Sequence, residues 1–115
     1  MKAGILESVE HLVVRKVPDF ELQRGSVILK VKVCSICSTD LRIYRYGDTR
    51  VELPQVLGHE IAGVVEAVAD GVANYRVGAR LAISPKIACG VCFYCSKGQY
   101  AYCQNSRTFG YQLHC

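Results

Sequence analysis

Hydrophobic and polar positions alternate with a period of two in several short segments of the chain. The clearest alternation runs from Ser26 to Val33, where Val27, Leu29, Val31 and Val33 fall on one face and Lys30 and Lys32 on the other. Such alternation is typical of a strand with one buried face. Shorter segments of similar character, each with a Gly or Pro nearby, are Lys2–Glu7, His11–Val17, Ile61–Ala69 and Ala79–Ser84. These segments predict a mainly β domain of the barrel or sandwich type.

One segment predicts a helix instead. Ser38, Thr39 and Asp40 can cap a short helix through Leu41–Tyr46, and Gly47 is a suitable residue just beyond its end. After Cys89 the apolar alternation fades. We therefore expect the segment after Cys89 to be ordered by something other than a hydrophobic face.

Length and charge narrow the function classes. A chain of 115 residues can bury a core of its own, so we expect one domain over residues 1–115. Its formal charge of +4 is mild and mixed in sign along the chain, which argues against nucleic acid or a membrane surface as a partner. We expect a cytoplasmic protein, because there is no long apolar run and no secretion signal.

The chain has seven cysteines, which without a secretion signal indicate metal binding more than disulfides. Four of them, Cys89, Cys92, Cys95 and Cys103, have the spacing C-x2-C-x2-C-x7-C. This spacing lets four thiolates from one loop surround a tetrahedral ion, and such a closed set is typical of structural zinc. We expect a zinc lobe over about residues 86–106.

Two alternatives for the four cysteines stay open. The first three also match an iron–sulfur run, although the wide gap before Cys103 and the Gln104 that follows it depart from that pattern. A stand-alone four-cysteine zinc module that binds a protein or nucleic acid, without catalysis, is the other alternative.

A second candidate site combines Cys37 with His59, which lies 22 positions later. Asp40 can accept a hydrogen bond from a ligating imidazole and so orient it. Glu60 adds a carboxylate next to His59, and Thr39 places a hydroxyl two residues from the thiol. These residues indicate an open metal site with polar groups around it.

Three stretches carry a resemblance to a known family. In this order along the chain, Val33–Asp40, Pro54–Val65 and the four-cysteine loop resemble the N-terminal portion of zinc-containing medium-chain alcohol dehydrogenases, which include polyol and threonine dehydrogenases. The resemblance implies a GroES-like irregular β-barrel with one short helix and a four-cysteine zinc lobe.

The resemblance also implies a role for each candidate residue. Cys37 and His59 would be ligands of a catalytic zinc, and Glu60 would be the adjacent carboxylate that can approach that metal. Asp40 would support the ligand histidine, and Thr39 would contact the substrate oxygen and begin a proton relay. The four thiolates of Cys89, Cys92, Cys95 and Cys103 would hold a structural zinc.

The implied reaction is the polarisation of a substrate hydroxyl by zinc, followed by hydride transfer to NAD or NADP. The implied partners are a small alcohol or polyol and further copies of the full-length chain in a homo-oligomer. No G-x-G-x-x-G fingerprint occurs in the sequence, so we expect the Rossmann cofactor domain and the third zinc ligand to lie outside this chain. The isolated chain is therefore expected to be inactive.

Some residues depart from the family pattern or fall outside it. Arg42 stands where many relatives carry a relay histidine, and a permanently charged guanidinium cannot shuttle protons in that way. Arg42 could meet an anion or form a surface salt bridge instead. Cys34 and Cys115 have no expected metal role.

Overall fold

The computed structural model describes residues 1–113 of the chain and is built mainly from strands. The strands are β1 (Lys2–Ser8), β2 (His11–Lys16), β3 (Val27–Ser35), β4 (Gln55–Val56), β5 (Glu60–Val68), β6 (Arg80–Ala82), β7 (Lys86–Ile87) and β8 (Arg107–Thr108). The helices are α1 (Ser38–Tyr46), α2 (Phe93–Ser96) and a short 3-10 helix (Tyr100–Tyr102). No helix in this part of the chain is long and apolar enough to cross a membrane.

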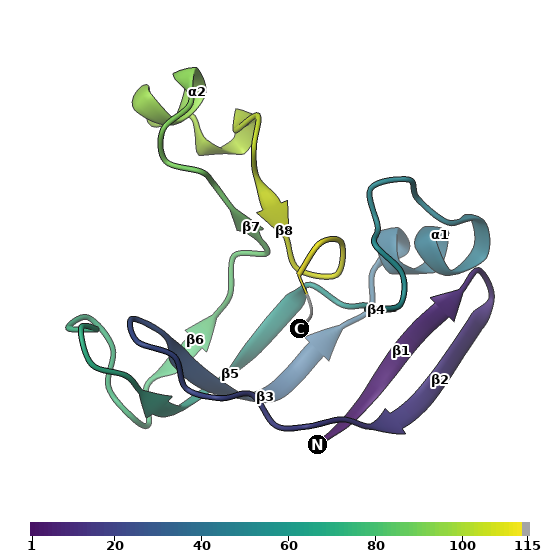
Figure 1. The fold of residues 1–115 in the computed structure, drawn as a ribbon, viewed down its shortest axis with the longest axis horizontal. Helices are drawn as coiled ribbons and strands as arrows, with labels where there is room; N and C mark the ends of the chain where they lie inside the picture. The colour runs from purple at the N-terminus through teal and green to yellow at the C-terminus, as the bar shows by residue number, and fades with distance from the viewer. Residues whose placement is uncertain (114–115) are drawn as a thin grey trace.

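The strands form three antiparallel sheets. Two have three strands, in the orders β2-β1-β4 and β3-β5-β6, and the third is the β7-β8 pair. Within residues 1–113 these sheets are not joined by strand pairing into a closed ring, so the predicted barrel is open. The β7-β8 pair and α2 project away from the two larger sheets, as Figure 1 shows.

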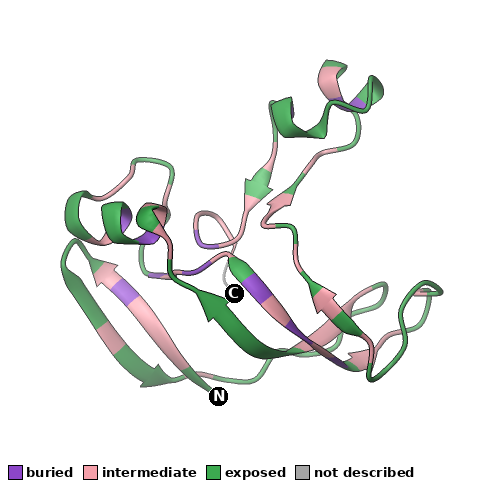
Figure 2. Ribbon diagram, turned by 180° about the vertical axis from the view of Figure 1, so that it is seen from behind, coloured by how far each residue is buried: buried purple, intermediate pink, exposed green. Residues whose placement is uncertain are grey.

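The buried core of this domain is small. Leu6 of β1, Ile43 of α1 and Val65 of β5 are its largest fully buried apolar side chains. Figure 2 shows how little of the ribbon is buried and how much is exposed. With few apolar side chains to hold it, the domain has to draw order from hydrogen bonds and from its cysteine clusters as well.

The prediction that one face of β3 is buried along its length is wrong toward the C-terminal end of the strand. Val31 and Val33 are 51% and 55% exposed, although they continue the alternation of Val27 and Leu29. The pairing register with β5 shifts between Ile28 and Leu29 and again between Val31 and Val33, as it does at bulges, which breaks the strict alternation of faces. Within residues 1–113 these two side chains are therefore only about half covered.

Close backbone approach explains one glycine in the central pair of strands. A Cβ atom on Gly63 of β5 would overlap the carbonyl group of Lys30 on β3. Because only glycine fits there, β3 and β5 can run close together along nine residues each. This pairing fixes β5, whose first residue directly follows His59.

Candidate metal centres

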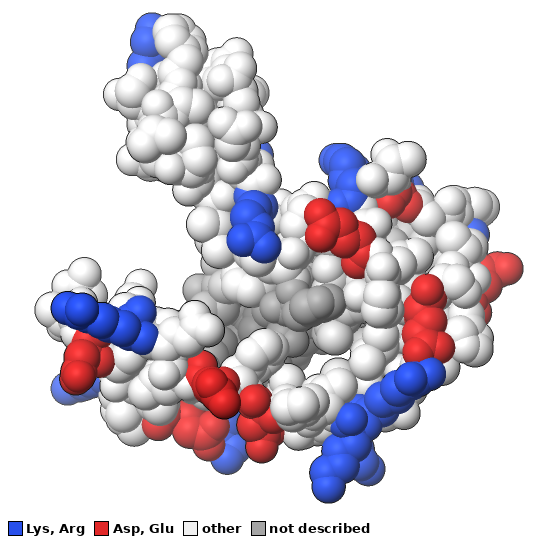
Figure 3. Space-filling view, viewed as in Figure 1, with Lys and Arg blue, Asp and Glu red and all other residues white. Residues whose placement is uncertain are grey.

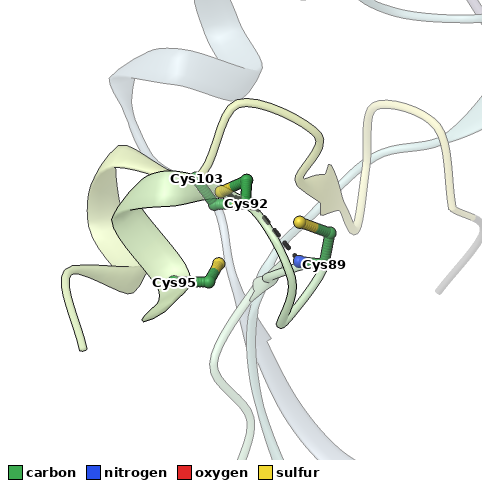
Figure 4. Close-up of side chains that lie close together, drawn as sticks. All are labelled: Cys89, Cys92, Cys95 and Cys103. Atoms are coloured by element: carbon green, nitrogen blue, oxygen red, sulfur yellow. Dashed lines mark hydrogen bonds between the residues drawn. The ribbon is translucent and has the colours of Figure 1, made fainter. Parts of the chain in front are cut away.

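The four cysteines of the lobe come together as the spacing predicts. Cys89 follows β7, Cys92 and Cys95 belong to the turn and helix of α2, and Cys103 follows the 3-10 helix. Figure 4 shows the four side chains around a common centre, and one ligand atom from each lies within 4.8 Å of all the others. The short β7-β8 pair closes the base of the lobe.

The sulfur separations fit zinc and exclude a disulfide. Cys92 Sγ and Cys103 Sγ are 4.0 Å apart. Thiolates around a tetrahedral zinc lie about 3.8 Å apart, given a Zn–S bond of about 2.3 Å, whereas bonded disulfide sulfurs lie at about 2.05 Å. All four cysteines are free thiols.

Backbone amides prepare two of the thiols for ionisation. Hydrogen bonds from the backbone of Gln104 and then of Cys95 lower the pKa of Cys92 to about 6. Backbone hydrogen bonds from Val91 and Cys92 lower the pKa of Cys89 as well. Burial, in contrast, raises the pKa of Cys95 to about 12. Four thiolates can therefore coexist here only with a cation among them, which fits a bound metal ion.

The second candidate centre begins at the first turn of α1. Cys37 is the N-cap residue of the helix, one position earlier than the capping residues that the sequence suggests. Its Sγ accepts a hydrogen bond from Thr39 N at 3.3 Å, and its own backbone N–H donates to Asp40 Oδ2 at 3.0 Å. This reciprocal capping fixes the thiol at the positive end of the helix.

Asp40 also positions the second candidate ligand, His59. Its side chain is buried, and its Oδ1 accepts a hydrogen bond from Gly58 N at 3.0 Å, which positions the turn that carries His59. His59 Nδ1 lies 3.4 Å from the same oxygen. That nitrogen is buried without an aligned hydrogen-bond partner, so the pair has ion-pair distance but not hydrogen-bond geometry. A small ring rotation would let Nδ1–H donate to Asp40, as ligating histidines usually do to a carboxylate.

Cys37 and His59 face each other with the spacing of shared metal ligands. Cys37 Sγ and His59 Nε2 are 3.5 Å apart. A tetrahedral zinc holds a sulfur and a nitrogen ligand about 3.5 Å apart, from Zn–S of about 2.3 Å and Zn–N of about 2.0–2.1 Å. The structure therefore brings together Cys37, Asp40 and His59, with ligand atoms within 4.8 Å of one another.

Glu60 does not join this group. It is exposed at the start of β5, and its carboxylate is not among the clustered ligand atoms of the described residues. Its role as a metal-approaching carboxylate stays a prediction. Thr39, by comparison, lines the same cavity as His59.

This cavity, of about 350 Å³, is a feature that the sequence reasoning missed. Besides Thr39 and His59 its wall includes Arg50, Lys86, Thr108 and Tyr111. The wall joins segments far apart in the sequence, and no local pattern marks them as neighbours. The one hint in the sequence is that Lys86 lies shortly before Cys89, the first cysteine of the lobe.

Arg42 and Arg50 share one carboxylate beside the cavity. Arg42 Nη2 donates to Asp48 Oδ2 at 2.8 Å, and Arg50 donates to both Asp48 oxygens at 2.9 and 2.7 Å. These bonds, those of Arg50 first, hold the pKa of Asp48 well below its usual value. Arg42 thus forms the salt bridge that was one of its two predicted roles.

Cys34 is a free, exposed thiol. Cys115 lies outside the described residues.

The fold and the two clusters define a class of protein: a mainly β domain with one closed four-cysteine centre and one open cysteine–histidine centre. The family described as the alcohol dehydrogenase GroES-like domain matches residues 23–113. The chain belongs to this family. The family and the GroES-like fold expected from the sequence are thereby confirmed.

Curated relatives include several dehydrogenases. The L-threonine 3-dehydrogenase of Pyrococcus furiosus is 44% identical over 89 residues, which cover 75% of this chain and 26% of that protein. The alcohol dehydrogenase of Geobacillus stearothermophilus is 38% identical over 118 residues, covering 98% of this chain and 34% of that protein. The chain thus spans only a quarter to a third of the length of these relatives.

A solved structure gives the same family. A putative zinc-binding dehydrogenase from Sinorhizobium meliloti, bound to NADP, superposes with a TM-score of 0.90 at 35% identity, covering 98% of this chain and 33% of that one. The relatives support an oxidoreductase assignment for the family.

Proposed function

We propose that this chain is the zinc-binding catalytic domain of an NAD(P)-dependent dehydrogenase that oxidises a small alcohol or polyol. The observation that carries the proposal is the approach of Cys37 Sγ to His59 Nε2 at 3.5 Å, at the edge of a cavity. A closed four-cysteine lobe would explain structural zinc alone. The second, open pair next to an accessible cavity is what favours catalysis.

Each residue of the open centre has a task in this proposal. When bound, zinc supplies a Lewis acid that lowers the pKa of a substrate hydroxyl. Cys37 and His59 hold the metal, and Asp40 orients His59 through the backbone turn that it braces. Thr39, whose hydroxyl can both donate and accept, takes the proton that the substrate hydroxyl loses while it passes its own hydroxyl proton on to solvent. Arg42, paired with Asp48, takes no part in moving that proton.

The remaining partners belong to the same proposal. The hydride acceptor is NAD or NADP held by a nucleotide-binding domain outside this chain, and the third protein ligand of the zinc comes from there or from another segment outside it. Glu60 is proposed as a carboxylate that approaches the metal when the site rearranges. The full-length protein is proposed to be a cytoplasmic homo-oligomer, and the 115-residue chain alone to have no dehydrogenase activity.

Metal analysis tests the proposal directly. In the full-length protein, which supplies the third ligand, we expect two zinc ions per chain under zinc-replete conditions, and one zinc in a full-length variant that combines Cys37→Ala with His59→Ala. The matched control is Cys34→Ala with His11→Ala, which removes the same groups outside the clusters. If both double variants kept the metal content of the unchanged chain, the open zinc site would be refuted. One zinc in all three proteins would favour the four-cysteine interaction module, and bound iron would favour a cluster.

A further inference from the structure

Within residues 1–113, the wall of the cavity beside the open centre carries two cations and no acidic residue. Lys86 and Arg50 are part of its wall, and no Asp or Glu is among the described residues that line it. The other lining groups include the hydroxyl-bearing Thr39, Thr108 and Tyr111, which can donate hydrogen bonds. Such a wall is built to receive negative charge.

Lys86 is the cation that no carboxylate neutralises. Its Nζ donates to the backbone carbonyl of Ala101, and within the described part of the chain it forms no salt bridge. An ammonium group has further donors beyond that one bond. Lys86 is half-buried in the β7 strand, so its position is set by the sheet and by the lobe to which it bonds.

Arg50 contributes a second positive group, which Asp48 and Tyr111 hold in place. Two of its nitrogens bind Asp48, and its guanidinium lies 5.2 Å from the centre of the Tyr111 ring. The one carboxylate of Asp48 serves Arg42 as well, so this trio keeps a net positive charge. The remaining N–H groups of Arg50 are available to a ligand.

Hydrogen bonds tie the two sides of this wall together. Gln112 Nε2 donates to the carbonyl of Arg50 at 2.8 Å, and the carbonyl of Tyr111 accepts from Glu52 N at 3.0 Å and from Gln55 Nε2 at 2.8 Å. Gln55 is itself almost fully buried. The cationic wall is therefore preorganised rather than assembled from loose surface side chains.

We propose that the cavity binds the anionic end of the substrate, so that the substrate class is an alcohol bearing a phosphate monoester or carboxylate rather than a neutral alcohol. This inference rests on the proposed function, because it places the reacting hydroxyl at Thr39 and His59. The anionic end then lies in the same cavity, against Lys86 and Arg50. With zinc bound, the charges of Cys37 thiolate and Asp40 cancel that of the metal, so Lys86 stays uncompensated and the Arg42–Asp48–Arg50 cluster keeps its net positive charge.

The test uses the zinc-loaded full-length protein, which supplies the third zinc ligand, and amide NMR titrations with four probes. These are glycerol 3-phosphate, lactate, neutral glycerol and, to represent a cofactor phosphate, adenosine 2′,5′-bisphosphate. We expect glycerol 3-phosphate or lactate to shift the amides of Thr39, Thr108 and Tyr111, and glycerol to leave them unchanged. If glycerol 3-phosphate binds and lactate does not, the wall accepts a phosphate monoester. If lactate binds and glycerol 3-phosphate does not, the wall accepts a carboxylate.

Variants at Lys86 locate the effect. Lys86→Gln should weaken binding of the anionic alcohol about tenfold, as loss of a charge-assisted hydrogen bond does. Lys86→Arg should restore most of the affinity, and Lys16→Gln, the same change on β2 outside the cavity, should have no effect. Equal affinity in Lys86→Gln and the unchanged chain would overturn the inference. So would preferential, Lys86-dependent binding of the adenosine bisphosphate, since the anion would then be that of the cofactor.

Metal content measured on the same samples separates the two proposals. Two zinc ions with no anion binding would defeat only the substrate class. Lys86-dependent anion binding by a chain that holds a single zinc would defeat the dehydrogenase proposal and leave the cavity without a reacting metal beside it.

Discussion

The two cysteine-containing centres of this chain are built in different ways. The lobe takes all its ligands from residues 89–103, a single short segment, whereas the open centre joins Cys37 and His59 across two elements. The lobe is almost free of Lys, Arg, Asp and Glu in the space-filling view, apart from groups at its tip and base (Figure 3). Around the open centre, in contrast, buried and charged side chains do the positioning.

The two centres depend on different interactions for their order. In the lobe, apolar residues such as Val91 and Phe93 are 86% and 60% exposed, so hydrophobic burial contributes little and we expect metal binding to supply the order. The open centre depends on side-chain contacts for its order rather than on a metal ion. Asp40 holds the capping turn of α1 and the turn before β5 in place before any metal arrives.

The largest effect should come from breaking the metal set of the lobe. We expect Cys95→Ser to lose the zinc of the lobe and to expose the amides of residues 89–103 to rapid hydrogen exchange, because about 10 kcal/mol of zinc binding is folding energy at such sites. The sheets β2-β1-β4 and β3-β5-β6 should keep their protection. Zinc content and hydrogen exchange by mass spectrometry measure both results.

Cys34→Ser is the matched control, since Cys34 is free and exposed. It should change neither zinc content nor exchange in the lobe. If the metal-free lobe of Cys95→Ser exchanged as slowly as that of the unchanged chain, the claim that metal orders the lobe would be wrong.

A smaller effect is expected from removing the brace of the open centre. Asp40→Ala leaves the backbone N–H groups of Cys37 and Gly58 without their acceptor, which should cost about 3 kcal/mol of unfolding free energy. Zinc affinity at the open centre should also fall about 10- to 100-fold, as it does when the carboxylate behind a ligand histidine is removed. Urea unfolding and competition with a zinc chelator provide the two measurements.

Asp70→Ala removes an exposed carboxylate as the control and should leave both quantities unchanged. In Asp40→Ala the lobe should still bind its zinc normally. Equal loss of affinity at both centres would mean that they are coupled, and the contrast between them would not stand.

The sequence predicted the four-cysteine centre more completely than the open centre, because local spacing can be read from the sequence and long-range contacts cannot. The spacing of Cys89, Cys92, Cys95 and Cys103 is local, so the chain itself limits how far apart the ligands can lie. Helix α1 and its end at Gly47 were also predictable, because caps are local signals. The five longer strands appear close to where the alternation places them.

Long-range features were not predictable in this way. The cavity wall brings Arg50, Lys86 and Tyr111 together only after the chain has folded, and no period or spacing relates them. The exposure of Val31 and Val33 depends on a bulge and on what covers β3, which alternation alone does not reveal. The role of Asp40 lies between these cases, since its position in the helix was local but its bond to Gly58 was not.

The smallest effect is expected in acid, at the loop beside the open centre. Asp48 has a folded-state pKa below its unfolded value because Arg50 and Arg42 donate to it. A carboxyl group with a lowered pKa stabilises the fold above its unfolded pKa of about 3.9, and this stabilisation is lost as the pH falls below that value.

Asp48→Asn should therefore lower the unfolding temperature at neutral pH, and the difference from the unchanged chain should shrink as the pH falls below about 4. Thermal unfolding across this range measures this difference, with Asp19→Asn, which removes a surface carboxylate paired with the N-terminus, as the control. Amides of the lobe should show no difference between Asp48→Asn and the unchanged chain at any pH, because the Asp48 cluster contacts the cavity wall through Arg50 and contacts none of the four cysteines. A pH-independent gap between the two proteins would show that Asp48 acts through packing and not through its charge.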